Sequence, residues 1–178
     1  MIVAFDTYYY DDFSYTVAGI FDNWRSEHTD ELICSKRIGI DADYVPGRLY
    51  ERELPCIMQC LKQIDVNKVD LIIVDGFVWL TDDDGKMKPV LGEMLHRAIL
   101  ETYGKEIEVI GIAKNPPHNK TGVEVRRGDS NKPLWVTCSN ISRTKDFAEL
   151  VRLMEGEFRI PNILKEVDQE TRKYRKIG

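Results

Sequence analysis

Three acidic residues stand where they could act together on a metal ion or a phosphate. Asp6 follows the apolar stretch that opens the chain, Asp75 follows the apolar run VDLIIV, and Glu53 begins an amphipathic segment. If the two apolar stretches are neighbouring strands, both aspartates project close together, and Glu53 reaches them from a helix above. Such oxygen ligands suit Mg²⁺ or Mn²⁺, which activate water and stabilise the oxygens of a phosphoryl displacement. Any one of these acids alone is more simply read as a turn or helix-cap residue.

The elements that must position these acids follow from the spacing of apolar residues. Apolar runs predict strands at residues 2–10, 13–24, 31–38, 69–76 and 107–113, and a hairpin of residues 122–127 and 134–138. Helical spacing predicts helices at residues 49–64, 90–103, 144–154 and 163–174. We expect Pro55 in the first turn of the main helix and a polar loop at residues 81–88. The continuous run 69–76 indicates a parallel strand covered on both faces.

The order of these elements predicts one α/β domain spanning residues 1–178. Three antiparallel strands that lead into a strand-helix-strand unit give a mixed sheet flanked by helices. No apolar run reaches the length of a membrane span, and the start of the chain lacks the features of a signal peptide. The four cysteines show no zinc-site spacing, which favours reduced thiols in a cytoplasmic protein. We also expect a monomer.

Charge is unevenly distributed along the chain. Residues 1–113 contain 11 Lys and Arg against 21 Asp and Glu, whereas residues 114–145 contain 7 against 2. An acidic half beside a basic segment is what a metal site serving a polyanion needs, although ordinary surface composition explains it equally well. The basic segment contains Lys120, Arg126, Arg127, Lys132, Arg143 and Lys145.

Several segments, in order, resemble the motifs of the endonuclease V family. Residues 44–54, YVPGRLYEREL, resemble its Tyr-Ile-Pro-Gly followed by Arg-Glu, and residues 69–76 resemble its strand ending in Val-Asp-Gly. Residues 110–114 resemble its Ile-Gly-Val-Ala-Lys, and residues 122–127 with 132–136 resemble its later hairpin. The order and approximate spacing hold over nearly the whole chain. The resemblance implies an RNase H-like fold and cleavage of DNA or RNA near deaminated, inosine-type bases, an activity of DNA repair.

The resemblance also implies roles for individual residues. Asp6, Glu53 and Asp75 match the family's catalytic metal-binding carboxylates, with Mg²⁺ or Mn²⁺ as cofactor, and Lys114 matches its active-site lysine. A lysine at that position holds the scissile phosphate or the leaving oxygen. Tyr44 matches the aromatic residue of a strand-separating wedge, whose ring offsets the unstacking that exposes a base.

Further residues are expected to contact the nucleic acid. A wedge at Tyr44 requires a pocket for the exposed base, and the backbone at Gly47 and Gly76 would line it. His96 keeps the register of the family's Gly-x-x-x-His. The side chains of the basic segment, Arg127 among them, are expected to follow the phosphate backbone. The predicted substrate-binding residues are therefore Tyr44, Pro46, Gly47, Gly76, His96, Arg126 and Lys132.

The chain departs from the family where two histidines are usual. Residues 77–84, FVWLTDDD, replace a shorter loop with His-Pro-Arg, and residues 138–142, CSNIS, replace Gly-His-Arg. Losing a general base typically lowers a rate by about 10²–10⁴. Three hypotheses follow: a metal-dependent endonuclease specific for modified bases, a nucleic-acid-binding homologue without turnover, and a nuclease selective for branched or flapped structures.

Overall fold

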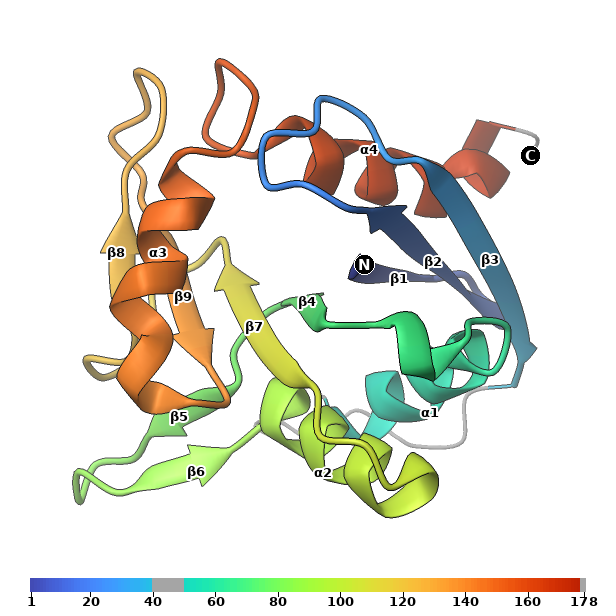
Figure 1. The fold of residues 1–178 in the computed structure, drawn as a ribbon, viewed down its shortest axis with the longest axis horizontal. Coiled ribbons are helices and arrows are strands. Elements are labelled where there is room, and N and C mark those ends of the chain that lie inside the picture. The colour runs from blue at the N-terminus through green and yellow to red at the C-terminus, as the bar shows by residue number, and fades with distance from the viewer. Residues whose placement is uncertain (40–49, 177–178) are drawn as a thin grey trace.

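A mixed sheet of seven strands lies at the centre of the fold (Figure 1). The computed structural model describes residues 1–39 and 50–176. In spatial order the strands are β3 (Glu31–Ile38), β2 (Phe13–Phe21), β1 (Ile2–Tyr9), β4 (Leu71–Asp75), β7 (Glu108–Ala113), β9 (Leu134–Cys138) and β8 (Val123–Val125). Strands β1, β2 and β3 form an antiparallel meander, and β4 runs parallel to both β1 and β7. The predicted meander and parallel strands are therefore confirmed.

Helices cover both faces of this sheet. One face packs against α3 (Thr144–Arg152) and α4 (Asn162–Thr171), and the other against α1 (Tyr50–Leu61) and α2 (Leu91–Tyr103) (Figure 1). Short 3-10 helices are formed by Val66–Lys68, Ile141–Arg143 and Lys173–Lys176. None of the helices in residues 1–39 and 50–176 is both long and apolar enough to cross a membrane.

The central strand β4 is buried on both faces, which explains why its sequence is apolar without interruption. Leu71 and Ile73 belong to the core under α3 and α4, whereas Ile72 and Val74 belong to the core under α1 and α2. Successive side chains of a strand point to opposite faces, so a strand covered on both faces needs apolar residues at every position. This arrangement confirms the prediction made from the run at 69–76.

Two local expectations were wrong. Pro55 lies inside α1 and not in its first turn, because the helix already begins at Tyr50. Burial of its apolar side, which includes Ile57 and Leu61, outweighs the backbone hydrogen bond that a proline cannot make. The polar stretch at 81–88 is also not simply a loop, because it joins a two-stranded hairpin of β5 (Trp79–Thr81) and β6 (Met87–Pro89). Strands of three residues are too short to show a period in sequence.

Candidate active site

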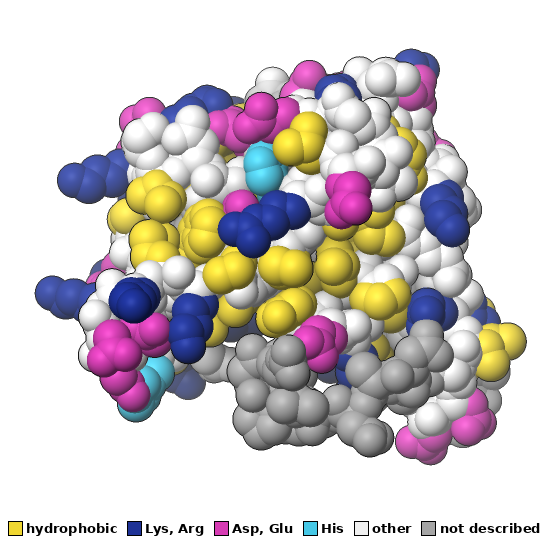
Figure 2. Space-filling model, turned by 90° about the horizontal axis from the view of Figure 1, so that it is seen from below, with side chains coloured by type: hydrophobic (Ala, Val, Ile, Leu, Met, Phe, Trp, Pro, Cys, Tyr) yellow, Lys and Arg dark blue, Asp and Glu magenta, His cyan; other side chains and the backbone are white. Residues whose placement is uncertain are grey.

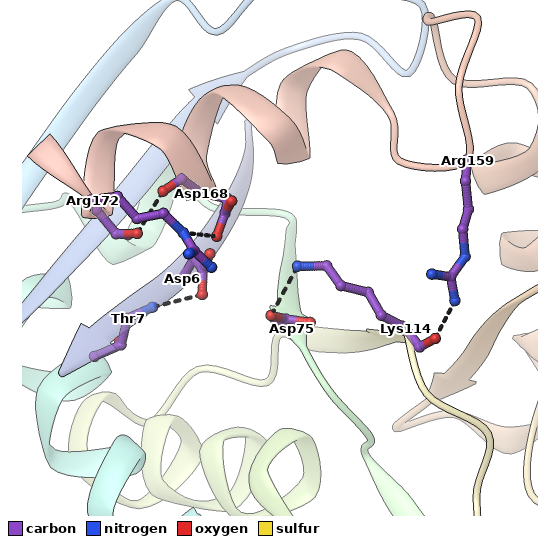
Figure 3. A network of polar contacts seen from close by, with 8 residues as sticks. Asp6, Thr7, Asp75, Lys114, Arg159, Asp168 and Arg172 are labelled. Atoms are coloured by element: carbon purple, nitrogen blue, oxygen red, sulfur yellow. Dashed lines mark hydrogen bonds and ion pairs between the residues drawn. The ribbon is translucent and has the colours of Figure 1, made fainter. Parts of the chain in front are cut away.

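Asp6 lies within β1, just past the point where its pairing with β4 ends, and Asp75 lies beside it at the carboxyl end of β4. The register pairs Phe5 of β1 with Val74 of β4, so the next residue of each strand is one of the two aspartates. Both line the same small cavity under α4, with Lys114. The Asp6 carboxylate accepts a 2.8 Å hydrogen bond from the backbone N–H of Thr7 (Figure 3). The structure thus brings together the two carboxylates that the sequence placed at strand ends.

Glu53 approaches from α1, on the opposite face of the sheet. The pKa of its carboxyl is raised to about 8, mainly by burial and then by the charges of Asp75 and Asp6. The pKa of Asp6 rises to about 7, mainly through burial, and then through the charge of Asp75 and a hydrogen bond that the protonated Asp6 carboxyl donates to Asp168. Burial and the repulsion between neighbouring carboxylates therefore act in the same direction, because both disfavour the ionised forms.

Lys114 supplies the positive charge of this group. It follows β7 directly, and its Nζ lies 3.4 Å from Oδ2 of Asp75 (Figure 3). Its backbone is held by Arg159, whose guanidinium donates to the carbonyls of both Lys114 and Pro133. The ammonium therefore stands at the end of the sheet where the two aspartates meet, with part of its surface open to solvent.

Asp168 is an acidic residue of this site that the sequence reasoning missed. It lies on α4, forms a side-chain hydrogen bond with Asp6, and accepts a 3.1 Å hydrogen bond from Nε of Arg172 (Figure 3). A signal for it was present in the sequence. Leu164 and Thr171 stand four residues before and three after it, so Asp168 is an acid on the buried side of an amphipathic helix.

The donor chemistry of the site fits a divalent cation. Asp6, Glu53 and Asp75 offer only carboxylate oxygens, and their mutual repulsion is what a bound cation would relieve. As the side chains stand, no three His, Cys, Asp or Glu residues within 1–39 and 50–176 are gathered as a ligand cluster. The nearest cation is Lys114, which pairs with Asp75. Binding of an ion therefore requires the carboxylates to turn toward one another.

A pocket of about 230 Å³ opens beside Glu53 and Asp75. Its remaining wall is mostly apolar and comes from Tyr50, Gly76, Phe77, Leu80, Val90 and Leu91. Gly76 has a φ of 131°, a conformation that strongly favours glycine, and a Cβ at this position would meet open space. A side chain at Gly111 would collide with the Gly76 carbonyl, with a Cβ to oxygen distance of 2.4 Å. Glycines therefore let the chain after Asp75 cross β7 closely and line the pocket.

The other predicted contact residues are divided between this site and the rest of the fold. Arg126 and Lys132 are exposed and lie around the β8–β9 turn, at the same end of the sheet as Lys114. His96 lies at the opposite end, where its Nδ1 is 2.7 Å from the carbonyl of Ile107, just before β7 begins. The structure does not bring it to the carboxylates. The predicted wedge residues Tyr44, Pro46 and Gly47 lie outside the described residues.

Two arginines of the basic segment have structural partners. Arg127 is only 5% exposed and donates to the carbonyls of residues 152, 154, 156, 158 and 159 in the segment between α3 and α4. Arg143 pairs with Glu108 at the amino end of β7, away from Lys114. The expectation that Arg127 follows a phosphate backbone is therefore wrong, because its guanidinium is buried among backbone carbonyls.

Comparisons with known proteins agree with this arrangement. No protein-family model matches the chain. Endonuclease V of Clostridium acetobutylicum is 23% identical over 150 residues, which make up 76% of this chain and 64% of that protein. The match thus spans a little less than two thirds of the relative's length.

Solved structures of endonuclease V share the fold. That of Bacillus subtilis is 21% identical with a TM-score of 0.66, and covers 99% of this chain and 80% of its own. That of Ciona intestinalis, in complex with a 24mer DNA containing an inosine followed by a ribo-adenosine, is 15% identical with a TM-score of 0.73. The second match covers 99% of this chain and 86% of the other.

The meander, the parallel strands β4 and β7 and the helices on both faces define an α/β protein with an RNase H-like fold. Asp6 of β1 and Asp75 at the end of β4 line one cavity of this fold. Within that class, the ordered motifs and the matches above make the chain similar to endonuclease V proteins.

Proposed function

We propose that the protein is a metal-dependent endonuclease that hydrolyses a phosphodiester near deaminated, inosine-type or otherwise modified bases in DNA or RNA. The observation that supports this proposal is that Asp6, Asp75 and Lys114 line one small cavity, and that the charges of both aspartates raise the pKa of Glu53. Its relatives in Clostridium acetobutylicum and Bacillus subtilis are named endonuclease V, and that of Ciona intestinalis was solved with inosine-containing DNA. A role in DNA repair follows from the same activity.

Each part of the site has a place in such a reaction. Asp6, Glu53 and Asp75 would hold Mg²⁺ or Mn²⁺, which supplies an activated water and charge stabilisation for a phosphoryl displacement. The ammonium of Lys114, 3.4 Å from Asp75, offers positive charge to a phosphate oxygen placed against the carboxylates. The apolar pocket beside Glu53 and Asp75 is a space for a base turned out of its stack.

A second candidate function is binding of nucleic acid without turnover. It is favoured by the absence of histidine from residues 77–84 and 138–142 and by the position of His96 at the far end of the sheet. The paired state of Asp75 with Lys114 also suits a site held together without a metal. Binding alone does not distinguish the two functions, because both predict it, whereas cleavage does.

The deciding experiment is cleavage of labelled single- and double-stranded DNA and RNA oligonucleotides, each with and without one inosine, in Mg²⁺ or Mn²⁺. Asp75→Ala serves as the blank. Asp70→Ala is a matched control. Asp70 is also an aspartate next to β4, which it immediately precedes, but it is exposed and pairs with the amino terminus. Cleavage near inosine that Asp75→Ala abolishes and Asp70→Ala retains supports the endonuclease. Binding of these oligonucleotides without any cleavage supports the second candidate.

A further inference from the structure

A second groove, of about 320 Å³, lies between the β5–β6 hairpin and the strands β8 and β9. Trp79 and Met87 of the hairpin form one side of it, and Ile141 and Lys145 near the start of α3 and Lys120 before β8 are among the residues opposite. Figure 2 shows the underside of the fold, with the hairpin and α2, where apolar side chains gather with Lys and Arg among them. The groove has the size of a small-ligand site.

Large apolar side chains in this groove remain open to solvent. Ile141 is 55% exposed and Met87 is 45% exposed, although both are large and apolar. Trp79 also lines the groove, and its Nε1 donates a 3.2 Å hydrogen bond to the carbonyl of Cys138. That bond holds the indole as part of the groove wall. The groove therefore offers a fixed apolar surface to a partner that brings an apolar face.

The charge of the groove is positive. Lys120 and Lys145 are the charged side chains that line it, and no acidic residue does. Neither lysine has a carboxylate within ion-pair distance among residues 1–39 and 50–176, whereas Lys88 and Lys114 are both paired. An apolar wall with unpaired lysines is complementary to a ligand that carries both apolar faces and negative charge.

The groove is continuous with the candidate active site through one short strand. Leu80 of β5 lines the pocket beside Asp75, while its neighbours Trp79 and Thr81 line the groove. Alternate side chains of a strand point to opposite sides, so β5 forms a wall of both spaces. A ligand in the groove therefore lies next to whatever occupies the pocket.

We propose that this groove binds an unpaired stretch of the nucleic-acid strand that flanks the cleavage site, and this rests on the proposed endonuclease function. In a duplex the faces of the bases are covered by the neighbouring bases, so they cannot stack on an apolar wall. Unpaired bases expose those faces and stack on aromatic and apolar side chains, while lysines hold the phosphates. The groove thus gives the protein a preference for substrates with a single-stranded segment beside the scissile bond.

The test measures binding without cleavage, by anisotropy of labelled single-stranded and duplex oligonucleotides of one sequence in EDTA over a range of salt. The double variant Lys120→Ala, Lys145→Ala is expected to lower the salt slope for single strands by about 1.4, since each phosphate contact contributes about 0.7. Ile141→Asp, at an exposed position, is expected to weaken single-strand binding by about tenfold. Lys62→Ala and Leu100→Asp, exposed residues outside the groove, are the matched controls.

The outcomes separate this inference from the proposed function. Unchanged affinity and salt slope in the groove variants would show that the groove does not bind nucleic acid. Equal losses for single strands and duplex overturn its assignment to an unpaired strand. If the wild-type protein cleaves nothing but the groove variants still lose single-strand binding, the endonuclease is overturned and the groove stands. A wild-type protein that cleaves, with groove variants that lose their preference for single-stranded flanks, supports both.

Discussion

Asp168 of α4 lies beside Asp6 of β1 and helps to raise the pKa of its carboxyl, so the C-terminal helix contributes an acid to a site built from the first strand. Arg172, one turn further along α4, donates to the same Asp168 carboxylate and orients it (Figure 3). The site therefore depends on the docking of α4 against the sheet, and not only on its strands.

The first prediction concerns Asp168. Asp168→Ala should lower cleavage by about 10²-fold or more while leaving the protein folded, because it removes a carboxylate that neighbours Asp6. Single-turnover cleavage rates and thermal melting check the two parts of this statement. Asp146→Ala, at an exposed acid of α3, should retain the wild-type rate. A rate for Asp168→Ala equal to that of this control would mean that Asp168 has no part in the reaction.

The second prediction separates chemistry from binding at the same end of the sheet. Lys114→Met should lower the cleavage rate by about 10²–10³-fold with a smaller effect on affinity, because in the proposed reaction the ammonium beside Asp75 stabilises the charge that develops on the phosphate. Lys132→Met should do the reverse, since Lys132 is exposed in the β8–β9 turn and is proposed to contact only the phosphate backbone. Rates at saturating enzyme and binding curves distinguish them. Identical behaviour of the two variants would argue against a catalytic role for Lys114.

The third prediction is a pH dependence of stability in the metal-free protein. The pKa of Asp6 is raised to about 7 and that of Glu53 to about 8, so the unfolded chain loses these protons at lower pH than the folded protein does. Stability should therefore fall as pH rises from about 4 to about 8 in EDTA, and be unaffected by these groups below that window. Mg²⁺ should restore stability at the upper end, because it binds the ionised carboxylates.

Thermal melting across this pH range, with EDTA or Mg²⁺, is the measurement. Asp6→Asn should flatten the curve in EDTA. Asp70→Asn should not change the fall over its upper part, because a hydrogen bond from the amino terminus lowers the pKa of Asp70. If the stability of the metal-free protein instead rose with pH through this window, the pKa values of Asp6 and Glu53 would not be raised in the folded protein.

The fourth prediction compares two adjacent arginines. Arg127→Met should reduce the free energy of unfolding by about 3 kcal/mol, because it leaves several buried carbonyls between α3 and α4 without a donor. Arg126→Met should change stability by less than about 0.5 kcal/mol, since Arg126 is exposed, and should weaken nucleic-acid binding in a salt-dependent way. Urea unfolding and anisotropy measure the two effects. Equal stabilities for the two variants would show that the Arg127 contacts contribute little.

Short-range sequence patterns were sufficient to predict most of the strands and helices of this protein. Alternating residues identified the meander, and the run that ends at Asp75 identified a parallel strand covered on both faces. These patterns alone also placed Asp6 and Asp75 at strand ends. The physical reason is that strand and helix periods determine which side chains share a face, and parallel neighbours end at the same edge of a sheet.

Only the tertiary structure decided which distant residues meet. Asp168 joins Asp6 because α4 docks on the sheet, and His96 lies at the far end because α2 runs away from Asp75. Arg126 and Arg127 look alike in sequence, yet one is exposed and the other binds five carbonyls. Local periodicity does not encode such contacts, because they depend on the packing of elements far apart in the chain.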